Sequence, residues 1–197
     1  MPETASLPRL MVAIASGDSP TVSATLQATP SLATARLARA DEFFINQCRA
    51  QVYADDTALH AAAFAYDDVI GRELLALGAD VRARNRRGAE PLHAAVMGAP
   101  GSVRWNPDRQ QRMIKLLIGA GADPNAMAAG GVTPLHRAVR NRCSAAVETL
   151  LEAGADRSAR NDRGSTPLDT ARSTTGRGGV GSEAAKEEQR LIIGLLT

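Results

Sequence analysis

The 197-residue chain is poor in aromatic residues, in cysteine and in lysine. Aromatic side chains make up 3% of the sequence, whereas alanine occurs 37 times and hydrophobic residues reach 44%. A core built from so many small side chains favours closely packed helices over a β-sandwich. The two cysteines, Cys48 and Cys143, are too few and too far apart for a disulfide framework or a zinc cluster. We expect both to be reduced thiols in an intracellular protein.

The chain also lacks any apolar run close to the roughly 20 residues that span a bilayer. Near the N-terminus, Glu3 precedes any basic residue, and the apolar run 10–15 is too short for a secretory signal. We therefore expect a cytoplasmic, monomeric protein with no membrane contact. The formal net charge is +2, with 21 arginines and two lysines, so charge alone does not require a nucleic-acid or membrane partner.

Three short motifs recur in register along the chain, which is the signature of a repeat protein. The first motif centres on a leucine, and its copies are 33, 43 and 33 residues apart, at Leu59, Leu92, Leu135 and Leu168. The second motif is Gly-Ala-Asp, at residues 78–80, 121–123 and 154–156. The third is a single glycine that opens each unit, at Gly88, Gly131 and Gly164. Motifs in phase predict an array of similar modules.

Each unit has the pattern of two helices. A start such as Thr133-Pro134 suits a helix N-terminus, because the hydroxyl accepts from free amides and proline lacks a donor there. Leucine and small alanines predict a narrow first helix. The second helix carries larger residues at helical spacing, such as Val69, Ile70, Leu74 and Leu75. Glycine then ends the second helix, and the stretch 85–88 predicts a hairpin tip.

The sequence Thr133-Pro134-Leu135-His136, followed by Gly-Ala-Asp at 154–156, resembles the ankyrin repeat family. The resemblance is strong over residues 55–172 and weaker outside them. It implies an all-α solenoid of about five stacked helix-turn-helix repeats with β-hairpin tips, including degenerate capping repeats at both ends. It also implies a binding surface made from the hairpin tips and the first helices.

We interpret the chain as a single domain that departs from the regular pattern in places. Its predicted parts are an N-terminal capping repeat (1–33), an inserted finger (34–54), central repeats (55–164) and a C-terminal capping repeat (165–197). The finger holds three of the six aromatic residues, and Asp55 stands where later units carry glycine, which puts the usual turn in doubt. Two interpretations of the finger stay open: it folds back over the stack, or it binds a partner.

A ten-residue insertion explains the leucine spacing of 43, and it predicts a loop near residues 98–108 that contains Trp105. This tryptophan either anchors the loop to its own domain or contacts a partner. Near the C-terminus, residues 176–181 match the letters G-x-G-x-x-G. The dinucleotide motif requires a preceding strand, whereas a helix is predicted here, so we interpret the segment as a loop and expect no cofactor.

The three histidines, His60, His93 and His136, occupy equivalent positions in successive units. Equivalent points on packed helices lie roughly 8–10 Å apart, whereas zinc ligands lie about 2.0–2.1 Å from the metal, so they cannot share one ion. We expect each histidine to bridge backbone groups between neighbouring helices and hairpins. The sequence contains no recognisable nucleophile–base pair, phosphate-binding loop or metal motif, so we expect no enzymatic activity and no bound metal.

Arginines gather near the predicted tips and after one first helix, at Arg82, Arg84, Arg86, Arg87, Arg140, Arg142, Arg157, Arg160 and Arg163. Stacking of the units would align them in a basic stripe. The stripe is either a solvated face or a site for an acidic protein segment, since guanidinium groups bind carboxylates bidentately. Nucleic acid is the less favoured partner, because acidic residues are dispersed among the arginines.

We predict a non-catalytic protein–protein interaction module whose partner is another protein, with an acidic surface as one option. From their positions in the unit, the candidate contacts are Arg84, Arg86, Arg87, Met127, Val132, Arg140, Asn141, Asp162 and Arg163. Secondary candidates are the aromatic residues Tyr53, Phe64, Tyr66 and Trp105. Two other functions stay open: an adaptor that binds polyanions or nucleic acid through an Arg-rich concave face, and an enzyme-associated subunit.

Overall fold

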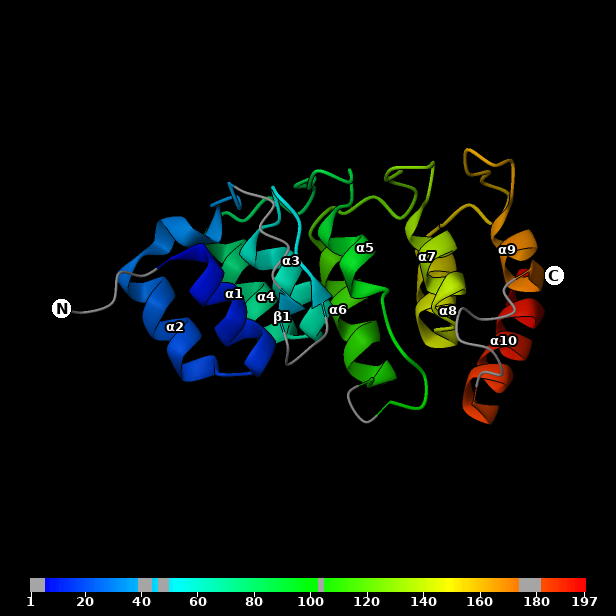
Figure 1. Cartoon of the computed structure of the whole chain (residues 1–197), viewed down its shortest axis with the longest axis horizontal. Helices are drawn as coiled ribbons and strands as arrows, with labels where there is room; N and C mark the ends of the chain where they lie inside the picture. Colours follow the sequence, from blue (N-terminus) through cyan, green and yellow to red (C-terminus); the bar gives the residue numbers. More distant parts are fainter. Residues whose placement is uncertain (1–5, 39–43, 46–49, 103–104, 174–181) are drawn as a thin grey trace.

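The computed structural model describes residues 6–38, 44–45, 50–102, 105–173 and 182–197. Ten α-helices in these residues form five antiparallel pairs that stand in a row from one end of the chain to the other (Figure 1). The pairs are α1 (Leu7–Ser16) with α2 (Ser19–Ala28), α3 (Ala58–Ala65) with α4 (Asp68–Ala76), α5 (Pro91–Ala95) with α6 (Pro107–Gly119), α7 (Pro134–Arg140) with α8 (Ser144–Glu152), and α9 (Pro167–Ser173) with α10 (Glu183–Leu196). The predicted all-α solenoid of five stacked units is confirmed.

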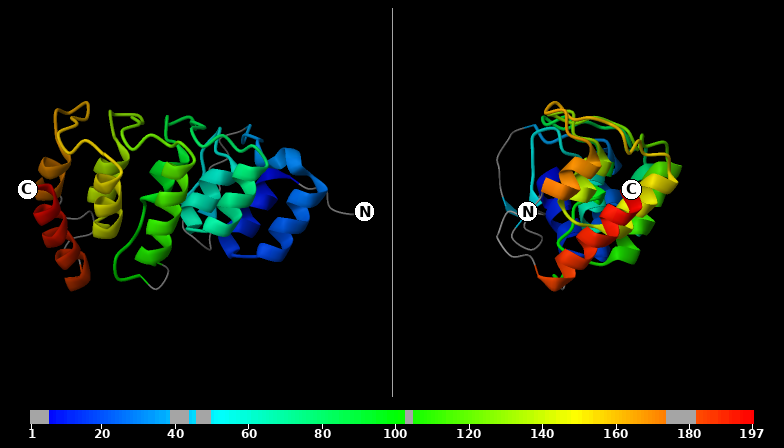
Figure 2. Two further views of the ribbon diagram at one scale, coloured as in Figure 1. Left: turned by 180° about the vertical axis from the view of Figure 1, so that it is seen from behind. Right: turned by 90° about the vertical axis from the view of Figure 1, so that its right-hand side faces the viewer.

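The repeated leucines form the centre of the stack. Leu59, Leu92 and Leu135 are each 0% exposed, and the first helices that carry them are rich in buried alanine. Small side chains let these helices approach closely, so α3 packs between α1 and α5, and α7 packs against α5 and α9. The second helices form a parallel layer in which α6 packs between α4 and α8. The end-on view in Figure 2 shows both layers, with the connecting loops above them.

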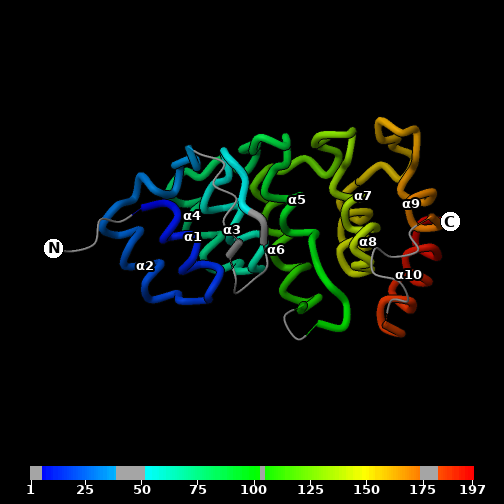
Figure 3. Tube along the Cα trace, in the orientation of Figure 1, coloured from blue at the N-terminus to red at the C-terminus, as the bar shows by residue number. Residues whose placement is uncertain are grey.

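We call the loops between units fingers, and the regular ones span residues 79–90, 122–133 and 155–166. They project from the same end of the stack, as the trace in Figure 3 shows. One backbone hydrogen bond links each finger to the next: Arg86 N–H to Ala54 O (2.9 Å), Ala129 N–H to Arg87 O (2.8 Å) and Asp162 N–H to Gly130 O (3.0 Å). The tips are therefore fixed relative to one another.

The fingers share a turn in the left-handed backbone region. Gly88, Gly131 and Gly164 have φ angles of 66°, 66° and 76°, and Asp55 has a φ of 65°. Aspartate is one of the few side-chain-bearing residues that adopt this region readily. The turn that Asp55 put in doubt therefore forms.

The inserted finger belongs to the core at its base. Leu37 N–H donates to the Asp56 carbonyl at 3.0 Å, and Asp55 N–H donates to the Leu37 carbonyl at 2.9 Å. Leu37 and Val52 are both buried. Between these ends, β1 (Phe44–Ile45) and β2 (Ala50–Gln51) form an antiparallel pair, and a 3-10 helix, η1 (Pro30–Ala33), precedes the finger. Residues 39–43 and 46–49, including Phe43 and Cys48, lie outside the described residues, so the two interpretations of the finger stay untested.

The structure corrects two local predictions. Val69 is 69% exposed, because the next residue of the helix, Ile70, turns toward the core instead. Helix α6 begins at Pro107 with Asn106 as its N-cap, so the predicted loop near 98–108 ends earlier. The Gly-rich segment 176–181 lies outside the described residues.

Candidate functional site

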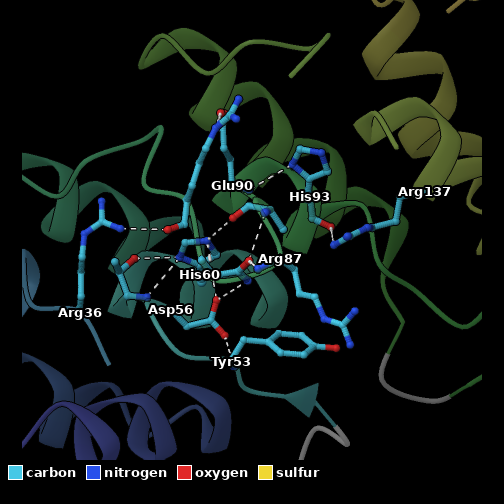
Figure 4. A network of polar contacts seen from close by, with 12 residues as sticks. Arg36, Tyr53, Asp56, His60, Arg87, Glu90, His93 and Arg137 are labelled. Carbon is cyan, nitrogen blue, oxygen red and sulfur yellow. Dashed lines mark hydrogen bonds and ion pairs between the residues drawn. The ribbon is translucent and has the colours of Figure 1, made fainter. Parts of the chain in front are cut away.

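Each histidine joins the start of a first helix to the following finger, and Figure 4 shows His60 and His93. His60 Nδ1 lies 3.2 Å from the Thr57 backbone nitrogen and 3.0 Å from Thr57 Oγ1. Its Nε2 lies 3.0 Å from the Ala89 carbonyl oxygen. A neutral ring with the proton on Nε2 satisfies these contacts, because Nε2–H donates to the carbonyl and Nδ1 accepts from the amide. The predicted bridging role is confirmed.

The same bridge recurs in the next two units. His93 Nε2 lies 3.1 Å from the Val132 carbonyl oxygen, and His136 Nε2 lies 3.0 Å from the Ser165 carbonyl oxygen. Burial lowers the pKa of His93 to about 3. Burial also lowers the pKa of His60. Since both of their ring nitrogens are bonded within the fold, these two histidines are structural rather than proton carriers.

Asparagine side chains build two of the three regular finger tips, and the tip predicted at 85–88 is one of them. Asn85 Nδ2 donates to Asp56 Oδ1 at 2.8 Å, which ties the third unit's tip to the second unit. Asn85 Oδ1 accepts from the amides of Arg87 (2.9 Å) and Ala89 (3.1 Å). Asn161 accepts from two amides of its own tip in the same way. The available signal was an asparagine three residues before the repeated glycine.

Part of the predicted arginine stripe is committed to the fold. Arg84 Nε lies 3.1 Å from Glu90 Oε1, and Arg82 Nε donates to the Gly121 carbonyl at 2.8 Å. Arg142 is 9% exposed, so it does not belong to an exposed stripe, which corrects the prediction for that residue. The arginines therefore do not form a continuous stripe of free guanidinium groups, because Arg82 and Arg84 bind other groups of the fold and Arg142 is buried.

Two of the predicted arginines lie on one aromatic ring. The guanidinium carbons of Arg86 and Arg87 lie 5.3 and 5.4 Å from the centroid of the Tyr53 ring, within cation–π range. Both arginines are exposed and Tyr53 is half-buried. The ring comes from the second unit and the arginines from the third, so the stack brings three of the predicted contact residues together.

The remaining candidates divide by exposure. Those exposed on the fingers and on α7 are Arg84, Met127, Arg140, Asp162 and Arg163, and those half-buried are Phe64, Val132 and Asn141. Met127 is 54% exposed although it is apolar. Their use by a partner stays a prediction.

Tyr66 and Trp105 instead hold the long loop of the third unit. Tyr66 is 7% exposed, and its hydroxyl donates to the Met97 carbonyl and accepts from Gln110 Nε2. Trp105 Nε1 donates to Gln110 Oε1 at 3.1 Å, and its ring packs against the core. Tyr66 therefore offers almost no surface to a partner, which corrects that candidate. The geometry of Trp105 favours the anchoring interpretation.

Arg137, a residue of the first helix α7, was not singled out from the sequence. Equivalent positions in the two preceding units carry Ala61 and Ala94. Arg137 Nη1 donates to the His93 carbonyl at 3.2 Å, and its Nε has no hydrogen-bond partner among the described residues. Burial lowers the pKa of Arg137 to about 10, and the positive charge of Arg140 contributes to the shift. A long side chain in place of a repeated alanine was the available signal.

The described residues also form a groove, which lies away from the fingers. This groove of about 420 Å³ lies on the surface where α8 meets α10, and it is lined by Ser144, Glu148, Arg190, Leu191, Gly194 and Leu195. Among the residues that the structure describes, no cluster of three or more His, Cys, Asp or Glu side chains is arranged to hold a metal ion. No helix in the described part of the chain has the length and apolar character that crossing a membrane requires.

The chain matches the sequence profiles of a known protein family. The family profile for the ankyrin repeat matches residues 55–86 and 87–129, and the profile for ankyrin repeats in many copies matches residues 116–171. The chain belongs to the ankyrin repeat family. It is 41% identical over 75 residues to the mouse (Mus musculus) protein named ankyrin repeat and SOCS box protein 16. That stretch is 37% of this chain and 16% of the relative, so the likeness covers a small part of the relative's length.

Ankyrin repeats are generally protein–protein interaction modules and are typically non-enzymatic. In this ankyrin array, the fingers and first helices carry the exposed arginines, the exposed Met127 and the Tyr53 cluster. We call this surface the finger face.

Proposed function

We propose that the ankyrin array binds another protein through the finger face, and that the partner presents acidic side chains there. The observation that carries the proposal is the backbone link between successive fingers, such as Ala129 N–H to Arg87 O at 2.8 Å. Because the tips are already fixed, binding orders few main-chain degrees of freedom, and more of the contact energy appears as affinity.

The charges of the finger face support an acidic partner. Arg86, Arg87, Arg140 and Arg163 are exposed and come from three different units. Guanidinium groups pair with carboxylates through two parallel hydrogen bonds, which gives direction as well as attraction. Asp162 is an exposed acid of the same tips, so a partner of mixed charge with an acidic centre fits best.

Affinity capture from the source cells tests the proposal. We expect Arg86→Glu/Arg87→Glu to lose the partner that the wild-type array retains, because two attractive charges become repulsive. Arg109→Glu/Lys115→Glu is the matched control, since it makes the same charge change on exposed residues of α6. Equal loss with both variants would contradict a specific face. Capture that nuclease treatment abolishes would favour the nucleic-acid adaptor instead.

A further inference from the structure

We propose that Arg137 anchors a carboxylate site on the finger face, where its guanidinium acts with Arg87, Arg140 and the Tyr53 ring to hold one Asp or Glu side chain of the partner. The site rests on the proposed function and names the contact that the partner makes. It is distinct from the exposed tips, because its central cation lies largely buried between units.

The position of Arg137 is unusual for this stack. The equivalent residues Ala61 and Ala94 are small, as close packing of first helices requires. Arg137 instead extends from α7 to the His93 carbonyl of α5, 44 residues earlier in the chain. A packing function needs only a methyl group here, so the guanidinium calls for another explanation.

No acidic side chain of the described residues forms an ion pair with Arg137. Asp56 is an acidic residue that raises the pKa of Arg137, and both of its oxygens already accept bonds that build the fold. Asp56 Oδ1 accepts from Asn85 Nδ2 at 2.8 Å, and Oδ2 accepts from the Tyr53 amide at 2.6 Å. A largely buried cation with no dedicated counter-charge is unfavourable, and a carboxylate from outside the chain would compensate it.

Two of the surrounding groups are coupled electrostatically to Arg137, and a third lies on one of them. Tyr53 and Arg140 both affect the pKa of Arg137, the phenol raising it and the neighbouring cation lowering it. Arg87 stacks on the Tyr53 ring. Figure 4 labels Tyr53, Arg87 and Arg137 in one network of polar contacts, and the three residues come from three successive units. A planar carboxylate with two oxygens matches these guanidinium forks.

Arg137→Ala tests the site, because alanine is the residue at this position in the two preceding units. The probe is a fluorescent ten-residue peptide of alternating glutamate and serine, amidated at its C-terminus so that only side chains supply carboxylates. We expect the variant to bind it at least about tenfold more weakly than the wild type does. We also expect the free energy of unfolding to stay equal or rise, since an uncompensated buried charge is removed.

Arg109→Ala is the matched control, since it removes the same charge from an exposed position on α6. We expect it to change binding by less than about twofold. The proposal is overturned if Arg137→Ala weakens binding no more than Arg109→Ala does. It is also overturned if Arg137→Ala loses stability and keeps its binding, which is the result expected of a structural arginine.

A double-mutant cycle with the exposed Arg87 keeps the test decisive whatever Arg137→Ala does to folding. If Arg87 and Arg137 hold one carboxylate, the fold-loss of peptide affinity in the double alanine variant is smaller than the product of the fold-losses in the two single variants. Losses that multiply would overturn a shared site. If the wild type fails to bind the peptide while Arg86→Glu/Arg87→Glu still loses the cellular partner, this site is wrong and the proposed function stands.

Discussion

The fingers and the long loop of the third unit (residues 96–106) both project from the same stack, yet they are held in different ways. The fingers are joined by backbone hydrogen bonds and by the repeated histidines. The loop is held by side chains: Gln110 Nε2 donates to the carbonyls of Ala95 (3.0 Å) and Met97 (3.2 Å), and Trp105 donates to Gln110. Successive fingers are therefore held by the same kind of backbone hydrogen bond, whereas the inserted loop is held by side-chain hydrogen bonds of Gln110 and Trp105.

The largest expected effect is that acid weakens the fingers while leaving the loop's own bonds intact. Burial lowers the folded-state pKa of His93 to about 3, and it lowers that of His60 as well. The unfolded chain, with histidine pKa values of about 6.5, therefore binds protons that the folded chain does not. The contribution of His93 is fully present above about pH 6.5 and falls by about 1.4 kcal/mol per pH unit as the pH decreases from 6.5 toward 3. The contribution of His60 falls in the same direction. Urea unfolding as a function of pH measures this slope.

The loop residues 96–106 include no Asp, Glu or His. Burial raises the pKa of the Tyr66 hydroxyl and raises that of the Cys143 thiol to about 12, so neither of these groups titrates in acid. Burial also raises the pKa of Glu90, which opposes part of the acid effect, since the folded chain holds that proton more tightly. His93→Gln is expected to reduce the slope by about 1.4 kcal/mol per pH unit. An unchanged slope in this variant would show that His93 is not the titrating group.

Breaking the loop anchor is the next largest effect. Gln110→Leu removes the bonds to Ala95, Met97 and Trp105, and it leaves a buried carbonyl without a donor. We expect the free energy of unfolding to decrease by about 3 kcal/mol and the Trp105 fluorescence to shift toward that of a solvated ring. Gln111→Leu is the matched control, because its amide makes one long contact of 3.4 Å. Similar losses in both variants would contradict the anchor.

A smaller effect is expected where a finger tip meets the next finger. A Cβ on Gly131 would lie 2.6 Å from Asp162 Oδ1 and 2.9 Å from the Asp162 backbone nitrogen, at a φ of 66°. Gly164 has a similar φ of 76°, but no atom lies within 4 Å of the added Cβ. We expect Gly164→Ala to lower the free energy of unfolding by about 1 kcal/mol through strain alone, and Gly131→Ala to lower it by about 2 kcal/mol. Equal losses by urea unfolding would show that contact between fingers adds nothing.

The smallest effect is a gain of stability. Glu90 stands where Thr57 and Thr133 begin other units, and its Oε2 is buried without a partner among the described residues. Glu90→Thr supplies a hydroxyl for the neighbouring histidine, as Thr133 Oγ1 does at 2.9 Å from His136 Nδ1. We expect thermal unfolding to show a gain of about 1 kcal/mol. A loss would mean that the ion pair of Glu90 with Arg84 outweighs the unpaired oxygen.

Much of the stack could be predicted because its determinants are local and repeated. The buried Leu59, Leu92 and Leu135 follow from periodicity, and the histidine bridges follow from their equal positions. Exposure within a helix was less predictable, as Val69 shows, because one residue of rotation changes the face. The candidate site was predicted only in outline. Tyr66 is an aromatic residue of a kind common in binding surfaces, and the sequence therefore suggested a contact with a partner, but in the fold its side chain is buried.

The sequence by itself determined the unit, its repetition and the place of each finger, because these depend on spacing along one chain. Only the tertiary structure decided which polar groups meet. Arg137 reaches a carbonyl 44 residues away, and Arg87 lies on a ring from another unit. Such pairings depend on how neighbouring units are rotated and spaced when they stack, and no pattern within one unit contains that information.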